Sequence, residues 1–255
     1  MNKNINIKKF IINKKTLTNN KYALLIGISD YQNISDLNYC DEDIHSWCSY
    51  LKSKNYNISV FGDGNTLNNL NCEYYTNLAL EKNIKLYLNN LLNIIKPNDT
   101  LLLCTSGHGS GDGKGNSFIC LLDQQTYKTD EGTLYDFELI QILKKFNDKN
   151  VNIISFFDNC FSGGMLDEIN NLYLTSKNKN ICATSTCTYK GYGFDNSLYK
   201  HGQWTYFFLS TLTNKLYNNK ILNIIFNIAS NNYIKQCKLE LKNRPQIVGN
   251  KTLII

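Results

Sequence analysis

The sequence has little of several features that would assign it to particular classes of protein. Only two prolines occur among 255 residues, so the chain contains no proline-rich linker. No two cysteines have the C-x-x-C spacing of structural zinc sites, and no apolar run is long enough to cross a membrane. The net charge of +6 comes from dispersed lysines rather than from a basic block. We therefore expect neither a membrane nor a nucleic-acid partner.

The first twenty residues differ in composition from the remainder of the chain. They are rich in Lys, Asn and Ile, and their longest apolar run, Phe10-Ile11-Ile12, is too short for a signal-peptide core. We expect residues 1–20 to form a short arm that adds an edge strand. Residues 21–255 contain no internal repeat and no clear boundary, so we expect one domain.

The cysteines suggest a reducing environment. There are nine, an odd number, and several lie in apolar runs such as 101–104, where a free thiol behaves as a small apolar side chain. This usage suits a reducing compartment, and we expect a cytoplasmic protein.

Short apolar runs alternate with segments of helical spacing. Runs bounded by turn residues predict buried strands at 22–26, 58–61, 100–104, 151–157 and 181–183, and a last short strand at 246–248. Apolar residues recur every three or four positions across 44–51, 80–92, 139–146 and much of 203–234. Strands that alternate with helices predict an α/β domain, with a mainly parallel central sheet covered by helices on both faces.

Two loops at the ends of predicted strands carry reactive side chains. The strand at 100–104 leads into a glycine-rich loop with His108, and the strand at 151–157 leads into a loop with Cys160. Parallel sheets bind ligands at the carboxyl ends of their strands, so the two side chains meet if the strands are neighbours. A thiol beside an imidazole is the minimal unit for acyl transfer.

The same residues suggest the remaining parts of such a site. Backbone N–H groups at Gly109 and Cys160 are candidates for an oxyanion hole. No third side chain is evident to orient His108, although a backbone carbonyl could do so. Taken singly, a histidine in a glycine-rich loop is more often a surface residue, and a cysteine after a strand is more often a buried spacer. The two loops together, 52 residues apart as in caspases, favour catalysis.

The motifs around both residues resemble those of metacaspases. The segments SGHG at 106–109 and DNCFSG at 158–163 are similar to the family's SGHG and D-x-C-x-S-G motifs. The segments 21–28, 37–43, 202–205 and 244–247 are also similar to family segments, the last one with a shift. The resemblance implies a caspase-like fold and a cysteine endopeptidase with a His108–Cys160 dyad that needs no cofactor for its chemistry. It also implies a monomer.

The resemblance further implies a pocket for a basic side chain before the cut bond. Its four lining positions are Cys40, Asp43, Ser106 and Asp158. Two carboxylates would hold arginine or lysine of a polypeptide substrate through charge-assisted hydrogen bonds. Asp43 by itself is better explained as a first-turn helix residue. Asp158 raises the pKa of a nearby thiol, so its presence beside Cys160 needs a compensating role such as cation binding.

Calcium activation and self-cleavage are two further properties that the family suggests. Asp123, Asp136 and Asp167 fall at calcium-site positions, but Phe137 replaces one carboxylate of an Asp pair, and Asp136 is equally suited to cap a helix. Lys177 and Lys179 could be self-cleavage sites, or ordinary surface residues.

Two other functions remain compatible with the same fold. One is a catalytically silent module that acts by binding partners, and the other is an Asp-specific peptidase of the animal caspase type. The intact dyad disfavours the first. Asp43 and Asp158 disfavour the second, because a pocket for aspartate needs arginines and repels a like charge.

Overall fold

A central sheet of seven strands organises the chain. The computed structural model describes residues 19–68, 70, 74–126 and 131–255, so the edge strand predicted within 1–20 lies outside the described residues. The strand order is β12-β9-β8-β4-β1-β2-β3. The strands are β1 (Lys21–Gly27), β2 (Asn57–Gly62), β3 (Tyr75–Leu78), β4 (Thr100–Ser106), β8 (Asn152–Asp158), β9 (Ile181–Ser185) and β12 (Gln246–Gly249). Only the β12–β9 pair is antiparallel, which confirms the prediction of a mainly parallel sheet.

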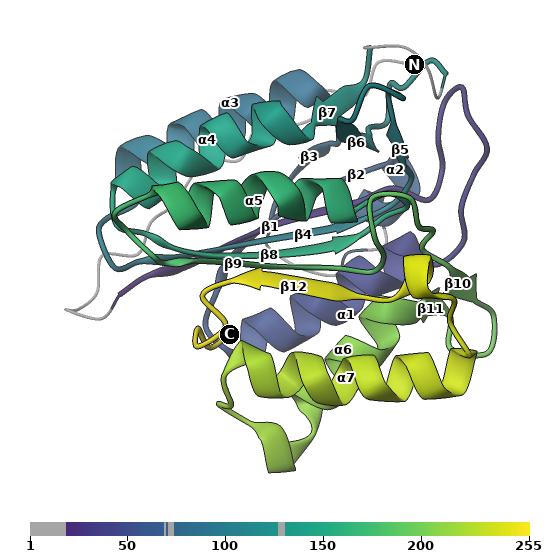
Figure 1. Cartoon of the computed structure of the whole chain (residues 1–255). Helices are drawn as coiled ribbons and strands as arrows, with labels where there is room; N and C mark the ends of the chain where they lie inside the picture. Colours follow the sequence, from purple (N-terminus) through teal and green to yellow (C-terminus); the bar gives the residue numbers. More distant parts are fainter. Residues whose placement is uncertain (1–18, 69, 71–73, 127–130) are drawn as a thin grey trace.

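Helices cover both faces of this sheet, as the alternation of patterns predicts (Figure 1). One face carries α3 (Glu81–Ile94), α4 (Asp136–Asp148) and α5 (Gly163–Thr175), and the other carries α1 (Cys40–Ser53), α6 (Gln203–Thr213) and α7 (Leu222–Cys237). Because successive strand side chains point to opposite faces, Leu24 packs in one apolar core and Leu25 in the other. None of the described helices combines the length and the apolar character needed to span a bilayer.

Several small elements surround the sheet. A three-stranded antiparallel sheet comprises β5 (Gly109–Gly111), β6 (Ser117–Cys120) and β7 (Thr133–Tyr135), and a hairpin comprises β10 (Asp195–Asn196) and β11 (His201–Gly202). The helix α2 (Gly64–Asn68) and the 3-10 turns η1 (Lys215–Tyr217) and η2 (Leu241–Asn243) complete the described elements. The sequence analysis missed these elements, β3 and the helix α5. Most of them are too short to show a clear period.

The register of β4 and β8 places the ends of both strands at the same rim. Ser106, the last residue of β4, pairs with Asp158, the last residue of β8, and with Gly27 at the end of β1. The loops that follow β4 and β8 therefore start side by side. This juxtaposition of neighbouring strands is the condition that the sequence analysis set for a shared site.

The aromatic core under the sheet provides a test of the packing. Trp47 of α1 is fully buried and lies against Phe156 of β8 and Phe208 of α6, with ring centroids 5.1 and 6.2 Å apart. The Trp47→Ala variant should lower the free energy of unfolding by about 3–5 kcal/mol, because a large cavity replaces these contacts. Urea unfolding measures the change. Leu198→Ala is the control, since Leu198 is 81 % exposed, and it should change stability by less than about 0.5 kcal/mol. Equal effects of both substitutions would contradict the packing.

Candidate active site

The loops after β4 and β8 are in direct backbone contact. The amide of Gly107 donates to the carbonyl of Asp158 at 3.4 Å. A Cβ atom on Gly109 would lie 2.3 Å from the carbonyl oxygen of Cys160, so only glycine permits this approach. The histidine loop and the cysteine loop are therefore held as one unit at the rim of the sheet.

Asn159 links the two loops through its side chain. It is buried, and its Nδ2 donates to the carbonyl of Gly107 at 2.9 Å and to that of His108 at 3.4 Å. Its Oδ1 accepts from the hydroxyl of Thr105. The sequence analysis missed this residue because it occupies the variable position between the two fixed residues of the D-x-C motif. A buried amide with partners on both sides fixes the position of the histidine loop relative to the cysteine loop.

The imidazole of His108 is oriented by a backbone carbonyl. Its Nε2 lies 2.8 Å from the carbonyl oxygen of Ser35, which accepts only, so in the neutral ring Nε2 carries the proton and Nδ1 keeps the lone pair. Burial lowers the pKa of His108, against the opposing effects of the Ser35 bond and the charge of Asp36. The ring is therefore neutral near pH 7 and can accept a proton at Nδ1.

The thiol of Cys160 is half-buried at the start of a sharp turn. Its Sγ lies 3.7 Å from the carbonyl oxygen of Gly193. Burial raises the pKa of Cys160, a backbone hydrogen bond from Gly193 opposes this effect, and the charge of Asp158 raises the pKa further. The thiol is therefore protonated near pH 7.

The backbone after Cys160 is strained. Phe161 has a φ of 59°, in the left-handed region that bulky side chains rarely adopt. Its amide donates to the carbonyl of Gly191 at 2.9 Å, and its ring packs edge-on against Tyr192. Strain of this kind persists only where the surroundings enforce it, and it turns the chain abruptly away from the thiol.

The pairing of β5 with β6 sets the direction of the Gly109 amide, which the sequence analysis proposed as an oxyanion donor. The amide of Cys120 on β6 donates to the carbonyl of His108 at 3.0 Å. Hydrogen-bonded and non-hydrogen-bonded pairs alternate along antiparallel strands, so the next pair, Gly109 with Ile119, is a non-hydrogen-bonded one. The Gly109 N–H is therefore directed away from β6.

The hydroxyl of Tyr31 completes this end of the strand pair. It accepts from the amide of His108 at 2.8 Å and donates to the carbonyl of Cys120 at 3.4 Å. The hydroxyl therefore replaces a direct hydrogen bond between the amide of His108 and the carbonyl of Cys120. The Tyr31 and His108 ring centroids are 5.0 Å apart, so the same residue also supports the imidazole.

The four residues predicted to line a basic pocket lie close to one another, and Asp158 among them lies near the thiol. Asp43 in the first turn of α1 is fully buried, and its Oδ2 accepts from the hydroxyl of Ser106 at 2.6 Å. Cys40 begins the same helix, and burial, together with the charge of Asp43, raises the pKa of its thiol. Asp158, at the end of β8, is 7 % exposed. A fifth residue, Gly202, separates the carboxylates: a Cβ on it would lie 2.6 Å from Asp158 Oδ2 and 2.8 Å from Asp43 Oδ2.

Backbone and side-chain donors hold both carboxylates in place. The Oδ2 atom of Asp158 accepts from the amide of Thr205 at 2.9 Å and from its hydroxyl at 2.7 Å. Asp43 accepts from the amide of Gly202, at 3.1 and 3.2 Å to its two oxygens, and from Nδ1 of His201 at 2.8 Å. Burial is the main cause of the raised pKa of both carboxylates. It raises the pKa of Asp43 to about 7, and it also raises the pKa of Asp158. The sequence analysis missed His201, which directly precedes the 202–205 motif.

The three residues predicted for calcium do not form a metal cage. Asp136 begins α4, and its two oxygens accept from the amides of Ser117 and Phe137, both at 2.7 Å. In the part of the chain that the structure describes, no three His, Cys, Asp or Glu side chains gather so that they could hold a metal ion. Asp123, Asp136 and Asp167 are therefore not gathered into one set of ligands in the described residues.

The effect of the Asp158 charge on the Cys160 thiol can be tested directly. Mass spectrometry can measure the rate at which iodoacetamide alkylates Cys160 at a series of pH values. The pH midpoint of this rate should lie above that of an ordinary cysteine. The Asp158→Asn variant should lower the midpoint, since it removes a negative charge that opposes thiolate formation. Asp148→Asn is the control, because the Asp148 side chain is 56 % exposed at the far end of α4. A midpoint that Asp158→Asn leaves unchanged would contradict the arrangement.

Comparisons with known proteins agree with this geometry. The family model described as "Metacaspase, peptidase C14 domain" matches residues 21–169, which include His108 and Cys160. Metacaspase-1 of Ajellomyces capsulatus is 27 % identical over 159 residues, which cover 59 % of this chain and 42 % of the relative. Metacaspase-1 of Eremothecium gossypii is 30 % identical over 162 residues, which cover 59 % of this chain and 33 % of the relative. Each match thus spans less than half of the relative's length.

A solved structure shows a similar fold over most of the chain. The crystal structure of a Geobacter sulfurreducens protein superposes with a TM-score of 0.64 and 16 % identity, and covers 90 % of this chain and 93 % of that one. This likeness concerns the fold alone. The family model covers more than half of the described domain, and the chain belongs to the metacaspase family of peptidase C14 domains.

Proposed function

We propose that this chain is a cysteine endopeptidase that cleaves polypeptides after arginine or lysine. Cys160 is the nucleophile, and His108 is the general base and acid. The observation that supports this most strongly is the pair of buried carboxylates at this rim of the sheet, of which Asp158 lies near Cys160. Within the described residues, neither Asp43 nor Asp158 has a lysine or arginine partner. Buried negative charges without a cation are costly, and a substrate cation would satisfy them.

Substrate binding and thiol activation are coupled in this site. A guanidinium or ammonium group beside Asp158 offsets the charge that raises the pKa of Cys160. The neutral imidazole of His108 then takes the thiol proton at Nδ1, while its Nε2–H remains bonded to Ser35. The correct substrate therefore promotes formation of its own nucleophile.

The chemical steps use the backbone around both residues. The sulfur of Cys160 attacks the carbonyl carbon, and the resulting oxyanion accepts hydrogen bonds from the amides of Gly109 and Cys160. As the C–N bond breaks, the imidazolium of His108 gives its proton to the leaving amine. Water, activated by the same imidazole, hydrolyses the thioester and releases the acyl product.

Several other features remain predictions of the same proposal. We expect a monomeric, cytoplasmic enzyme; the eight cysteines in the described residues are all free thiols, which supports a reducing location. Calcium stimulation through Asp123, Asp136 and Asp167 stays a prediction, which an assay with and without chelator tests. Self-cleavage at Lys177 or Lys179 also stays a prediction. The ammonium of Lys179 donates to the carbonyl of Leu174 at 2.9 Å, so cleavage there requires this contact to open.

The nucleophile assignment is tested with fluorogenic peptides that end in arginine, lysine or aspartate, read with calcium and with chelator. Cys160→Ala should abolish cleavage after arginine and lysine, and His108→Ala should lower kcat by about 100- to 10,000-fold. Cys237→Ala is the control, since Cys237 is a half-buried thiol at the end of α7. Activity that survives Cys160→Ala would contradict the mechanism. A wild-type chain that cleaves none of the peptides would favour the silent binding module instead.

The specificity assignment is tested separately by removing one charge. Asp158→Asn should lower kcat/KM for arginine-ended peptides roughly thirtyfold, because a buried charge-assisted hydrogen bond contributes about 2 kcal/mol. The same variant should change cleavage after a neutral residue much less. Asp148→Asn again serves as the exposed control. A parallel loss for basic and neutral peptides would show that Asp158 supports the structure rather than the choice of substrate.

A further inference from the structure

His201 lies between the buried carboxylate Asp43 and a surface groove. Its Nδ1 is 2.8 Å from Asp43 Oδ1, and its Nε2 is 3.4 Å from the hydroxyl of Ser46. The side chain of His201 is 19 % exposed, whereas that of Asp43 is fully buried. The imidazole therefore gives this pair a route for proton exchange with solvent.

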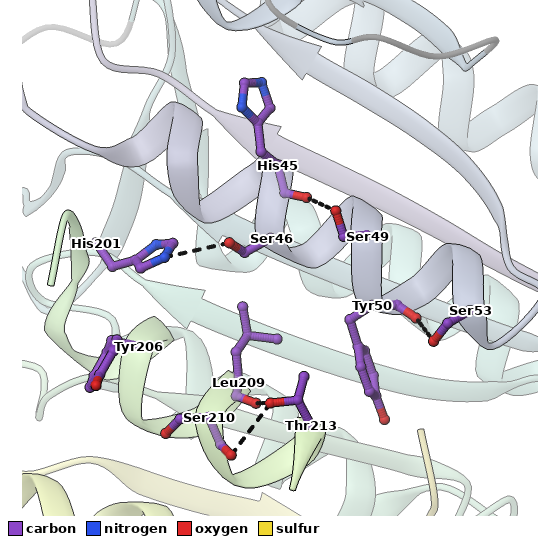
Figure 2. A pocket seen from close by; sticks show the side chains of 10 residues that line it. All are labelled: His45, Ser46, Ser49, Tyr50, Ser53, His201, Tyr206, Leu209, Ser210 and Thr213. Carbon is purple, nitrogen blue, oxygen red and sulfur yellow. Dashed lines mark hydrogen bonds between the residues drawn. The ribbon is translucent and has the colours of Figure 1, made fainter.

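The groove gives the outer edge of the ring access to water. It is a cavity of about 570 Å³ between α1 and α6, with His201 at one end and Thr213 near the other (Figure 2). Figure 2 shows the imidazole of His201 directed toward Ser46, while the ring of His45 points away from the other lining side chains. The groove thus contacts the pocket region through His201.

The charged groups around His201 are mostly acidic. The titratable groups that act on it or flank it are Glu42, Asp43 and His45 of α1, Asp158 of β8, Asp195 of the paired strand β10, Lys200 beside it in the chain and Tyr206 of α6. A protonated ring would stand 2.8 Å from Asp43 and occupy the position of a cationic partner.

We propose that His201 is a proton-sensitive specificity residue of the basic pocket. With a neutral ring, Asp43 keeps the negative charge that attracts arginine or lysine; with a protonated ring, that charge is cancelled and the pocket loses affinity for cations. This inference rests on the proposed function, since it concerns the same pocket. His201 touches no reacting atom, so it is a positioning residue that acts through Asp43.

The consequences for pH follow from the number of protons bound. Burial raises the pKa of Asp43 to about 7, so the pair takes up a proton as the pH falls through the neutral range. Whichever atom holds that proton, the net charge of the pair changes from −1 to 0. Affinity for a substrate cation is therefore highest on the alkaline side and falls with acidification. Two proton sites bind a first proton more readily than Asp43 would alone, so removing the imidazole should move this transition to lower pH.

The kinetic test compares KM for an arginine-ended peptide across pH 5.5–8.5 in the full chain. In the wild type, KM should rise about tenfold for each pH unit below the transition, with a smaller change in kcat. His201→Asn keeps a donor for Asp43 but cannot be protonated, and the transition should move to lower pH. His201→Lys holds a permanent cation, and KM at pH 8 should rise about 10- to 100-fold. His45→Asn, in the same groove, should match the wild type.

A binding test separates this inference from the proposed activity. The probe is agmatine, a guanidinium compound, titrated calorimetrically into the Cys160→Ala variant in buffers of different ionisation enthalpy. At pH 6 its binding should release close to one proton, and at pH 8 almost none; adding His201→Asn should reduce the release at pH 6. If agmatine binds and protons are released as expected but the chain has no peptidase activity, the proposed function is refuted and the inference is retained. No agmatine binding, no release at pH 6, or a release that His201→Asn leaves unchanged would overturn the inference.

Discussion

The parallel pairing of β4 with β8 is the constraint on which the site depends. Because Ser106 pairs with Asp158, the loops that follow start at the same level of the sheet. Asn159 then ties the loops together, and Gly109 permits the backbone contact between them. A slip of one residue in this register would turn the side chains of β8 to the opposite face and separate the two loops. The position of the thiol relative to the imidazole is therefore set by the fold rather than by the two side chains themselves.

The electrostatics of the rim follow from the same arrangement. Asp158 at the end of β8 places a buried carboxylate close to Cys160, and its negative charge raises the pKa of the thiol. Asp43 adds a second buried carboxylate from α1. Neither charge favours formation of the thiolate, but both are consistent with the proposed binding of a cationic side chain. In the proposed mechanism, the protonated thiol and the neutral imidazole of the resting state become reactive when the substrate binds.

Much of this could be predicted from the sequence, since apolar runs and helical spacing are local signals. The six predicted strands and the segments of helical spacing all appear, as does the sheet covered on both faces. The resemblance of the motifs predicted His108, Cys160 and the four pocket residues, and the structure brings Asp43 and Ser106 of that set into contact. Ser35 and Tyr31, which orient the histidine, were missed because a carbonyl contact and a hydroxyl bridge depend on how a loop folds back. His201 was missed for a similar reason: its partner Asp43 is 158 residues away in the sequence.

The central claim is that the fold presents Cys160, activated by His108, beside a pocket for basic side chains. The most direct measurement is covalent labelling by a peptidyl chloromethyl ketone with arginine at its reactive end, located by mass spectrometry on the full chain. The account predicts a label on Cys160 alone, strongly slowed by His108→Ala and absent with an aspartate-ended reagent. Equal labelling by both reagents, or a label on another cysteine that leaves Cys160 unmodified, would contradict it.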